Sequence, residues 1–170
     1  PGEENPNVIP GVVFLRKINL GQKVGIGQRV AVIGGGNVAI DAARTALRVG
    51  AKEVTILYRR SRAEMPAYEE DVEEAEEEGI RFQFLATPTE IVLKDGKVFS
   101  LRCTRMELGE PDASGRGRPV PLKGSDFFVE VDTVIPAIGQ TPDLSFVKGM
   151  EIETTPQGTI KADPVTLQTS

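Results

Sequence analysis

Three consecutive glycines, Gly34-Gly35-Gly36, stand between a short apolar run and a stretch of small side chains with helical spacing. The run before them, residues 29–33, is apolar on both faces, as a buried parallel strand requires. After them, alanines recur at i, i+3, i+4 and i+7 from Ala39, and Gly50 ends the stretch. This order of strand, glycine turn and helix predicts the start of a βαβ unit in a parallel sheet.

The rest of the chain extends this unit. We expect a second strand at 53–58, a second helix that begins near Pro66 and ends at Gly79, and a third strand at 81–86. Asp95-Gly96 between two strand-like runs predicts an antiparallel hairpin, with a bulge near Arg105. Residues 109–126, rich in Gly and Pro, are expected to form a long loop, and 127–139 the last core strand, with Pro136 at its end or beside a bulge. The expected fold is therefore α/β and three-layered, a parallel sheet with helices and an inserted antiparallel β-meander.

Residues 34–39 match the spacing G-x-G-x-x-[GA]. Gly34 would allow the tight turn, Gly36 would let the backbone approach a pyrophosphate, and Ala39 would allow close contact between helix and sheet. The free N–H groups of Asn37 and Val38, together with the helix dipole, would form an anion site. Because this motif lies directly between a buried strand and an amphipathic helix, it predicts a Rossmann-like NAD(P)-binding domain.

Tyr58-Arg59-Arg60 stands at the end of the second strand, where an NAD-binding unit carries Asp or Glu for the ribose 2′-hydroxyl. Arginine there predicts NADP(H), because a guanidinium matches the geometry of the 2′-phosphate and a carboxylate would repel it. The alternative is that both arginines are surface charges paired with the acidic helix that follows. Arg62 could assist, but its direction is left open by the sequence.

The remaining charged and reactive residues have simpler explanations. Eight carboxylates in residues 69–78 are interpreted as a solvated helix face. Asp41 either looks toward the nicotinamide end of the site or pairs with Arg44 at i+3. Cys103 is the only cysteine and is expected to pack inside a strand. We therefore expect no catalytic acid or base and no metal site in this chain.

The stretch "VIGGGNVAIDAARTALRVGAKEVTILYRRSRAEMPA", an acidic helix, "EEGIRF" and "AIGQTPD" resemble the NADPH-binding domain of the glutamate synthase small (beta) subunit family. That family includes the comparable region of dihydropyrimidine dehydrogenase and is a branch of the flavoproteins with two dinucleotide-binding domains. The resemblance implies that Ile138 and Gly139 pass beside the bound dinucleotide. The predicted cofactor-binding residues are Gly34, Gly35, Gly36, Asn37, Val38, Tyr58, Arg59, Arg60, Ile138 and Gly139.

The resemblance also implies a parent protein. We expect residues 1–170 to be one NADP(H)-binding domain, with a core of about 28–148, excised from a longer chain. Residues 1–20 and 150–170 would connect to an FAD-binding domain, and hydride would pass between NADPH and FAD, then electrons to iron-sulfur centres or a partner subunit. Alternatives are a nucleotide sensor without electron transfer and an S-adenosylmethionine-dependent methyltransferase, against which Arg59 counts.

Composition bounds the partners and the compartment. The net charge of −5 argues against nucleic acid, because phosphate binding along a duplex needs clustered positive charge. The sequence contains no run of about 18 apolar residues, so no membrane span is predicted. We expect a cytoplasmic protein.

Overall fold

The computed structural model describes residues 2–112, 115–140, 142–156 and 158–169. Its elements are α1 (Gly11–Asn19), β1 (Arg29–Ile33), α2 (Asn37–Arg48), β2 (Glu53–Tyr58), η1 (Arg62–Glu64), α3 (Glu69–Glu77), β3 (Arg81–Phe84), β4 (Ala86–Lys94), β5 (Lys97–Pro111), β6 (Gly117–Glu130), β7 (Thr133–Pro136) and η2 (Ser145–Val147). The chain divides into two compact units, Pro1–Ile138 and Gly139–Ser170. All the strands named here belong to the first unit.

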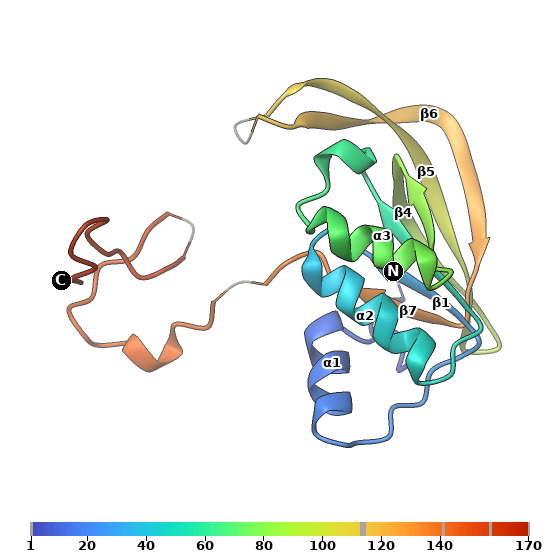
Figure 1. Cartoon of the computed structure of the whole chain (residues 1–170), viewed down its shortest axis with the longest axis horizontal. Helices are drawn as coiled ribbons and strands as arrows, with labels where there is room; N and C mark the ends of the chain where they lie inside the picture. Colours follow the sequence, from blue (N-terminus) through green and yellow to red (C-terminus); the bar gives the residue numbers. More distant parts are fainter. Residues whose placement is uncertain (1, 113–114, 141, 157, 170) are drawn as a thin grey trace. The chain divides into compact units, whose positions relative to one another are not determined.

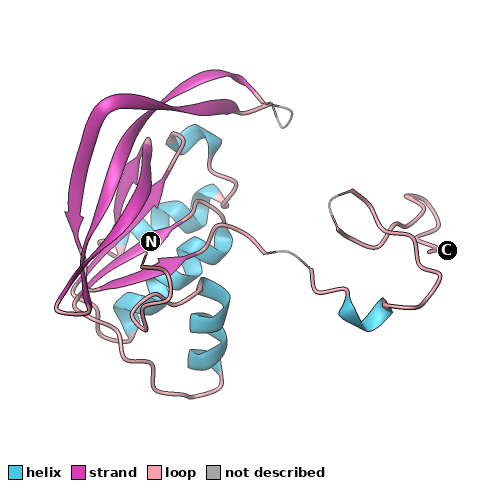
Figure 2. Ribbon diagram, turned by 180° about the vertical axis from the view of Figure 1, so that it is seen from behind, coloured by secondary structure: helices cyan, strands magenta, loops and turns pink. Residues whose placement is uncertain are grey.

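The first unit has three layers, as Figures 1 and 2 show. A parallel sheet with strand order β3-β2-β1-β7 lies in the middle. Helices α1, α2 and α3 cover one face of this sheet, and an antiparallel sheet with order β4-β5-β6 covers the other. The predicted α/β class, with a parallel sheet, helices and an inserted antiparallel meander, is therefore confirmed.

Two apolar cores hold the layers together, because successive side chains of β1 point to opposite faces of the sheet. Val30 and Val32 pack with Phe14 and with the small side chains of α2 in the core beneath the helices. Ala31 packs in the other core, with Leu101 of β5, between the two sheets. A strand that is buried on both faces cannot show an alternating pattern, which explains the continuous apolar run in the sequence.

The antiparallel sheet confirms two predictions and corrects one. Asp95 and Gly96 have positive φ values, +52° and +74°, and join β4 to β5 as the expected hairpin. The register of β5 against β6 shifts between Thr104 and Met106, where a bulge was expected. The predicted loop at 109–126 is wrong, since β5 continues to Pro111 and β6 begins at Gly117.

The two strands pair as a long two-stranded arm beyond the third strand of the sheet. Its prolines include Pro119 and Pro121, which lie opposite Leu108 and Met106. Proline is tolerated in such a ribbon because an outward-facing N–H makes no ladder hydrogen bond there. The glycines and prolines that predicted a loop are thus compatible with the edge strands of this arm.

Three further boundaries differ from the predictions. Helix α3 begins at Glu69, three residues after Pro66, and β3 ends at Phe84 because Leu85 has a φ of +52°. The predicted single strand at 127–139 is two strands, β6 and β7, which belong to different sheets. Pro136 is the last residue of β7 and lies opposite Ile33, so its predicted place at a strand end is confirmed.

The second unit contains η2 and two isolated bridges, Thr154 with Ile160 and Ala162 with Thr169. The prediction of one domain over residues 1–170 stays a prediction. Within the described residues, the helices are too short and too polar for any of them to cross a membrane.

Candidate functional site

The glycine turn and the double arginine lie at the same edge of the parallel sheet. Strands β1 and β2 pair in parallel with Ile33 opposite Leu57, so the residues that follow them emerge side by side at their carboxyl ends. The N–H of Gly34 donates to the carbonyl of Leu57 at 3.0 Å, which fixes the start of the turn against β2. Ligands of open α/β sheets bind in the crevice at this edge.

The first two glycines are required by the fold itself. Gly34 has a φ of +147°, and a Cβ there would lie 2.3 Å from the carbonyl oxygen of Ala137. A Cβ on Gly35 would lie 2.5 Å from ring atoms of Tyr58. Tyr58 is 7% exposed and its hydroxyl donates to the carbonyl of Glu64 at 2.8 Å, so its ring supports the turn from within. The backbone of the turn therefore packs directly on its neighbours.

Gly36 is different, because no contact within the described residues requires a glycine there. Its φ of −96° suits any residue, and the nearest atom to a Cβ there is Cγ of Pro66, 3.9 Å away. Helix α2 begins at Asn37 with no side-chain cap. The N–H of Ala39 donates to the carbonyl of Gly36, whereas the N–H groups of Asn37 and Val38 have no acceptor among the described residues and are open to an external one. The open space beside Gly36 and these donors fit a pyrophosphate, which needs close backbone approach and the positive end of a helix dipole.

The segment after β2 turns back over this glycine turn. The N–H of Ala67 donates to the carbonyl of Gly35 at 3.2 Å, and the N–H of Tyr68 donates to Oδ1 of Asn37 at 3.1 Å. Both hydrogen bonds join chain segments about thirty residues apart, so residues 66–68 border one side of the proposed pyrophosphate site.

The two arginines have different surroundings. Arg59 is exposed, whereas Arg60 is 4% exposed. Nη2 of Arg60 donates to Oδ2 of Asp112 at 2.5 Å, and its Nε donates to the carbonyl of Gly117 at 2.9 Å. Neither arginine pairs with α3 among the described residues, so the alternative that both serve the acidic helix finds no support. Both line a cleft of about 470 Å³, whose other side is the β5–β6 arm.

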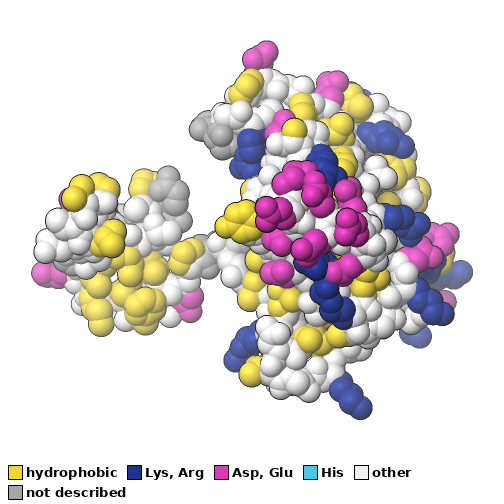
Figure 3. Space-filling view, viewed as in Figure 1, with side chains coloured by type: hydrophobic (Ala, Val, Ile, Leu, Met, Phe, Trp, Pro, Cys, Tyr) yellow, Lys and Arg dark blue, Asp and Glu magenta, His cyan; other side chains and the backbone are white. Residues whose placement is uncertain are grey.

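Arg62 serves the acidic helix instead. Its guanidinium pairs with Glu69 at 2.9 Å and with Glu76 at 2.6 Å. The hydrogen bonds that it donates, most of all to Glu76 and then to Glu69, raise the pKa of Arg62. Figure 3 shows the carboxylates of this helix gathered on one face of the molecule. Arg62 is thus directed to α3.

The predicted pairing of Asp41 with Arg44 is not made. The Arg44 guanidinium pairs with Glu74 of α3 and with Glu78, the residue that follows this helix, both at 2.7 Å. Hydrogen bonding to Glu78 is the largest cause of the raised pKa of Arg44. Asp41 is exposed. Its role toward a nicotinamide stays a prediction.

The other predicted residues are placed less directly. Ile138 is 77% exposed at the end of the first unit, and Gly139 begins the second unit with a φ of +109°. Their position beside a dinucleotide stays a prediction. Cys103 is fully buried, and burial raises the pKa of its thiol to about 11, which agrees with a packing role.

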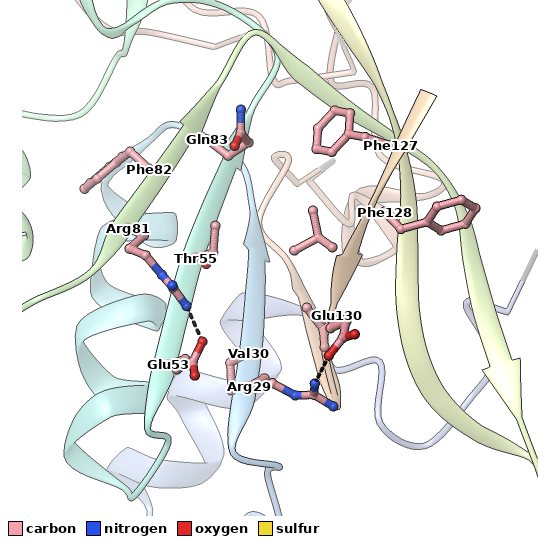
Figure 4. Close-up of a pocket in the computed structure, with 12 residues that line it drawn as sticks. Arg29, Val30, Glu53, Thr55, Arg81, Phe82, Gln83, Phe127, Phe128 and Glu130 are labelled. Atoms are coloured by element: carbon pink, nitrogen blue, oxygen red, sulfur yellow. Dashed lines mark hydrogen bonds and ion pairs between the residues drawn. The ribbon is translucent and has the colours of Figure 1, made fainter. Parts of the chain in front are cut away.

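A larger hollow, of about 660 Å³, lies at the opposite edge of the parallel sheet (Figure 4). It is lined by the first residues of β1, β2 and β3 and by the end of β6. Arg29 pairs there with Glu130 at 2.5 Å, and Arg81 pairs with Glu53. Amino ends of parallel strands lack the helix N-termini that bind anions, so size alone does not make this hollow the nucleotide site.

The cleft contains residues that the sequence analysis did not select: Glu110, Pro111, Asp112, Arg118 and Pro119. They belong to the segment expected to be a loop. Alternation of Arg116, Arg118 and Val120 with Gly and Pro is the one signal that could have indicated strand there.

Comparisons with known proteins agree with this fold and with the resemblance. Residues 1–170 match the family described as pyridine nucleotide-disulphide oxidoreductase. The NADP(+)-dependent formate dehydrogenase subunit beta of Moorella thermoacetica is 56% identical over 163 residues, which are 95% of this chain and 23% of that protein. The glutamate synthase (NADPH) small chain of Escherichia coli (strain K12) is 42% identical over 138 residues, 80% of this chain and 29% of that protein. The predicted resemblance is therefore confirmed.

Among solved structures, T. acidophilum thioredoxin reductase superposes with a TM-score of 0.70 at 23% identity, over 96% of this chain and 46% of that chain. At this identity the match supports the fold alone. The chain spans less than a third of the length of each of the two relatives by sequence.

Proposed function

The chain belongs to the pyridine nucleotide-disulphide oxidoreductase family, and on that premise we propose that it is the NADP(H)-binding part of an FAD-dependent oxidoreductase similar to the glutamate synthase small subunit. The observation that carries this proposal is the opening beside Gly36, next to the exposed Arg59 on the neighbouring strand end. The two features are separated along the chain by a helix and a strand, and the sheet places them at one edge.

Each group has a defined task in this proposal. The backbone N–H groups of Gly36, Asn37 and Val38 hold the pyrophosphate. Arg59 meets the 2′-phosphate through its guanidinium. Arg60, whose Nε and Nη2 are engaged by the carbonyl of Gly117 and by Asp112, forms the wall of the cleft beside it. Gly34, Gly35 and Tyr58 give the turn its shape, and Ile138 and Gly139 pass beside the dinucleotide.

The redox chemistry is that of the cofactors. When bound, NADPH supplies a hydride for FAD, which the rest of the parent protein would hold. This chain's residues bind and orient the dinucleotide and need supply no acid or base. Two relatives carry NADP(+) or NADPH in their names and are named as a subunit and a small chain, which supports the choice of dinucleotide and the existence of a partner subunit. Onward electron transfer to iron-sulfur centres or to that subunit, in a cytoplasmic assembly, is part of the proposal.

Binding of NADP⁺ and NAD⁺ to the full-length protein tests the proposal. We expect wild type to prefer NADP⁺, and Arg59→Gln to weaken NADP⁺ binding about tenfold, because one charge-assisted hydrogen bond to phosphate is lost, while NAD⁺ binding is unchanged. Arg62→Gln is the matched control, since it removes the same charge from the same turn but from a side chain held by α3. Equal affinity of wild type for both dinucleotides would overturn the choice of cofactor.

A second measurement separates the oxidoreductase from a nucleotide sensor. In anaerobic stopped-flow experiments, the full-length oxidoreductase reduces its flavin when NADPH is added, whereas a sensor binds the dinucleotide and leaves it unoxidised.

A further inference from the structure

We propose that Arg118, on strand β6 of the arm, is a specificity-determining residue that contacts the 2′-phosphate of NADP(H) from the side opposite Arg59. This inference rests on the proposed function and adds a residue from the antiparallel sheet to a site built on the parallel sheet. It also gives the β5–β6 arm, which reaches over the segment that follows β2, a role in cofactor choice (Figures 1 and 2).

The cleft has the size and lining that such a role needs. Its volume of about 470 Å³ lies within the range of ligand sites, roughly 300–1,000 Å³. One wall is Arg59 and Arg60 from the end of β2, and the other is Arg118 with its neighbours on the arm. Arg59 and Arg118 are exposed, and no ion pair joins either guanidinium to another side chain in the described part of the protein. Both forks are therefore available to a phosphate.

Arg60 fixes the position of Arg118. Its Nε donates to the carbonyl of Gly117, the residue directly before Arg118, and its Nη2 holds Asp112 of the same arm. Gly117 also packs tightly, because a Cβ there would lie 3.1 Å from both Oε1 of Glu64 and Cβ of Leu108. The arm is thus anchored one residue away from Arg118, which fixes the place from which its guanidinium approaches the cleft.

The balance of charge in the cleft favours a 2′-phosphate. Three guanidinium groups face two carboxylates there, and the ion pair between Arg60 and Asp112 neutralises one of each. Arg59 and Arg118 then remain against Glu110, a net charge of +1. A phosphate monoester carries about −1.5 to −2 at pH 7, so it offsets this excess positive charge, whereas the neutral 2′-hydroxyl of NAD(H) leaves the excess uncompensated.

Adenosine 2′,5′-bisphosphate and 5′-AMP are suitable probes, because they differ only in the 2′-phosphate and undergo no redox reaction. Calorimetric titration of the full-length protein should show that Arg118→Gln weakens the bisphosphate about tenfold and leaves 5′-AMP within twofold of wild type. The affinity of Arg118→Lys for the bisphosphate should lie between those of wild type and Arg118→Gln, because lysine keeps the positive charge but lacks the forked guanidinium donors. Lys123→Gln is the matched control: it removes an exposed cation from the same strand, outside the cleft, and should change neither affinity by more than about twofold.

The outcomes separate this inference from the function on which it rests. If wild type shows no preference for the bisphosphate, or Arg59→Gln leaves that preference intact, the proposed NADP(H) site itself is wrong. If Arg59→Gln weakens the bisphosphate and Arg118→Gln does not, only the role of Arg118 is overturned. Equal weakening of both probes by Arg118→Gln also overturns it, since the effect would then not act through the 2′-phosphate. Should Arg118→Gln fold poorly by circular dichroism, the same comparisons with Arg118→Lys decide.

Discussion

The contrast between Gly34 and Gly36 gives a decisive test of the glycine turn. Gly36→Ala places a methyl group in open space, 3.9 Å from its nearest neighbour, at a φ of −96° that alanine adopts freely. Loss of a favourable N-cap residue costs about 1 kcal/mol, and reduced freedom of the unfolded chain returns about 0.4–1 kcal/mol. The free energy of unfolding should therefore change by about 0.5 kcal/mol or less.

Gly34→Ala should behave in the opposite way. Its φ of +147° belongs to a region that is essentially restricted to glycine, at a cost of about 1–3 kcal/mol. The added methyl group would also stand 2.3 Å from the carbonyl oxygen of Ala137, and such overpacking costs a further 1–3 kcal/mol or so. We expect a loss of about 2–6 kcal/mol and a clearly lower thermal midpoint.

NADP⁺ binding then separates the two glycines. The methyl group of Gly36→Ala occupies the space through which the pyrophosphate reaches the N–H groups of α2. Losing one hydrogen bond to a charged group costs about 1.5–3 kcal/mol, so the dissociation constant should rise at least about tenfold. The assays are thermal unfolding of the full-length protein without nucleotide and calorimetric titration with NADP⁺. Unchanged NADP⁺ affinity in Gly36→Ala would refute the pyrophosphate site, and destabilisation equal to that of Gly34→Ala would refute the argument from open space.

Two further predictions concern the contacts that hold the sheets together. Arg60→Met should destabilise the arm by about 1–3 kcal/mol, because Asp112 and the carbonyl of Gly117 lose their hydrogen-bond donor. Amide hydrogen exchange in β5 and β6 should then become faster. The exposed Arg59→Met is the control, and equal exchange rates in the two variants would contradict the anchoring role of Arg60. Burial raises the pKa of Asp132, but hydrogen bonds from Arg29 and Gln28 outweigh it and leave this pKa below its usual value. Because the pKa of Asp132 is lowered in the folded state, its carboxylate stabilises the fold above about pH 4, and this stabilisation is lost as pH falls further. The thermal midpoints of wild type and Asp132→Asn should therefore differ most near neutral pH and converge in acid. A difference that does not depend on pH would refute this account.

Local patterns in the sequence were sufficient for much of the first unit. The strand before Gly34, the helix after it and the Asp95-Gly96 hairpin are each specified by residues within one element or turn, and all three are present. The arm was missed because its stability comes from pairing across the chain, Leu108 with Pro119 and Pro111 with Gly117, and not from local propensity. A glycine or proline ends a strand or is tolerated within it according to its position in the cross-strand pairing, which the local sequence does not specify.

The double arginine shows what the sequence could not predict about this cleft. Arg59 and Arg60 follow the last residue of β2, and although both line the cleft, only Arg60 is buried. The sequence gives no indication of which one turns outward, because that depends on the layer lying against each face of the sheet. The antiparallel arm covers the side of Arg60 and provides Asp112 and the carbonyl of Gly117 to bind it. The arm binds Arg60 in the wall of the cleft and also brings Arg118 to the cleft. Among the described residues, two guanidinium groups of the cleft thus make no ion pair, Arg59 and Arg118, and only Arg59 belongs to the Arg-Arg motif.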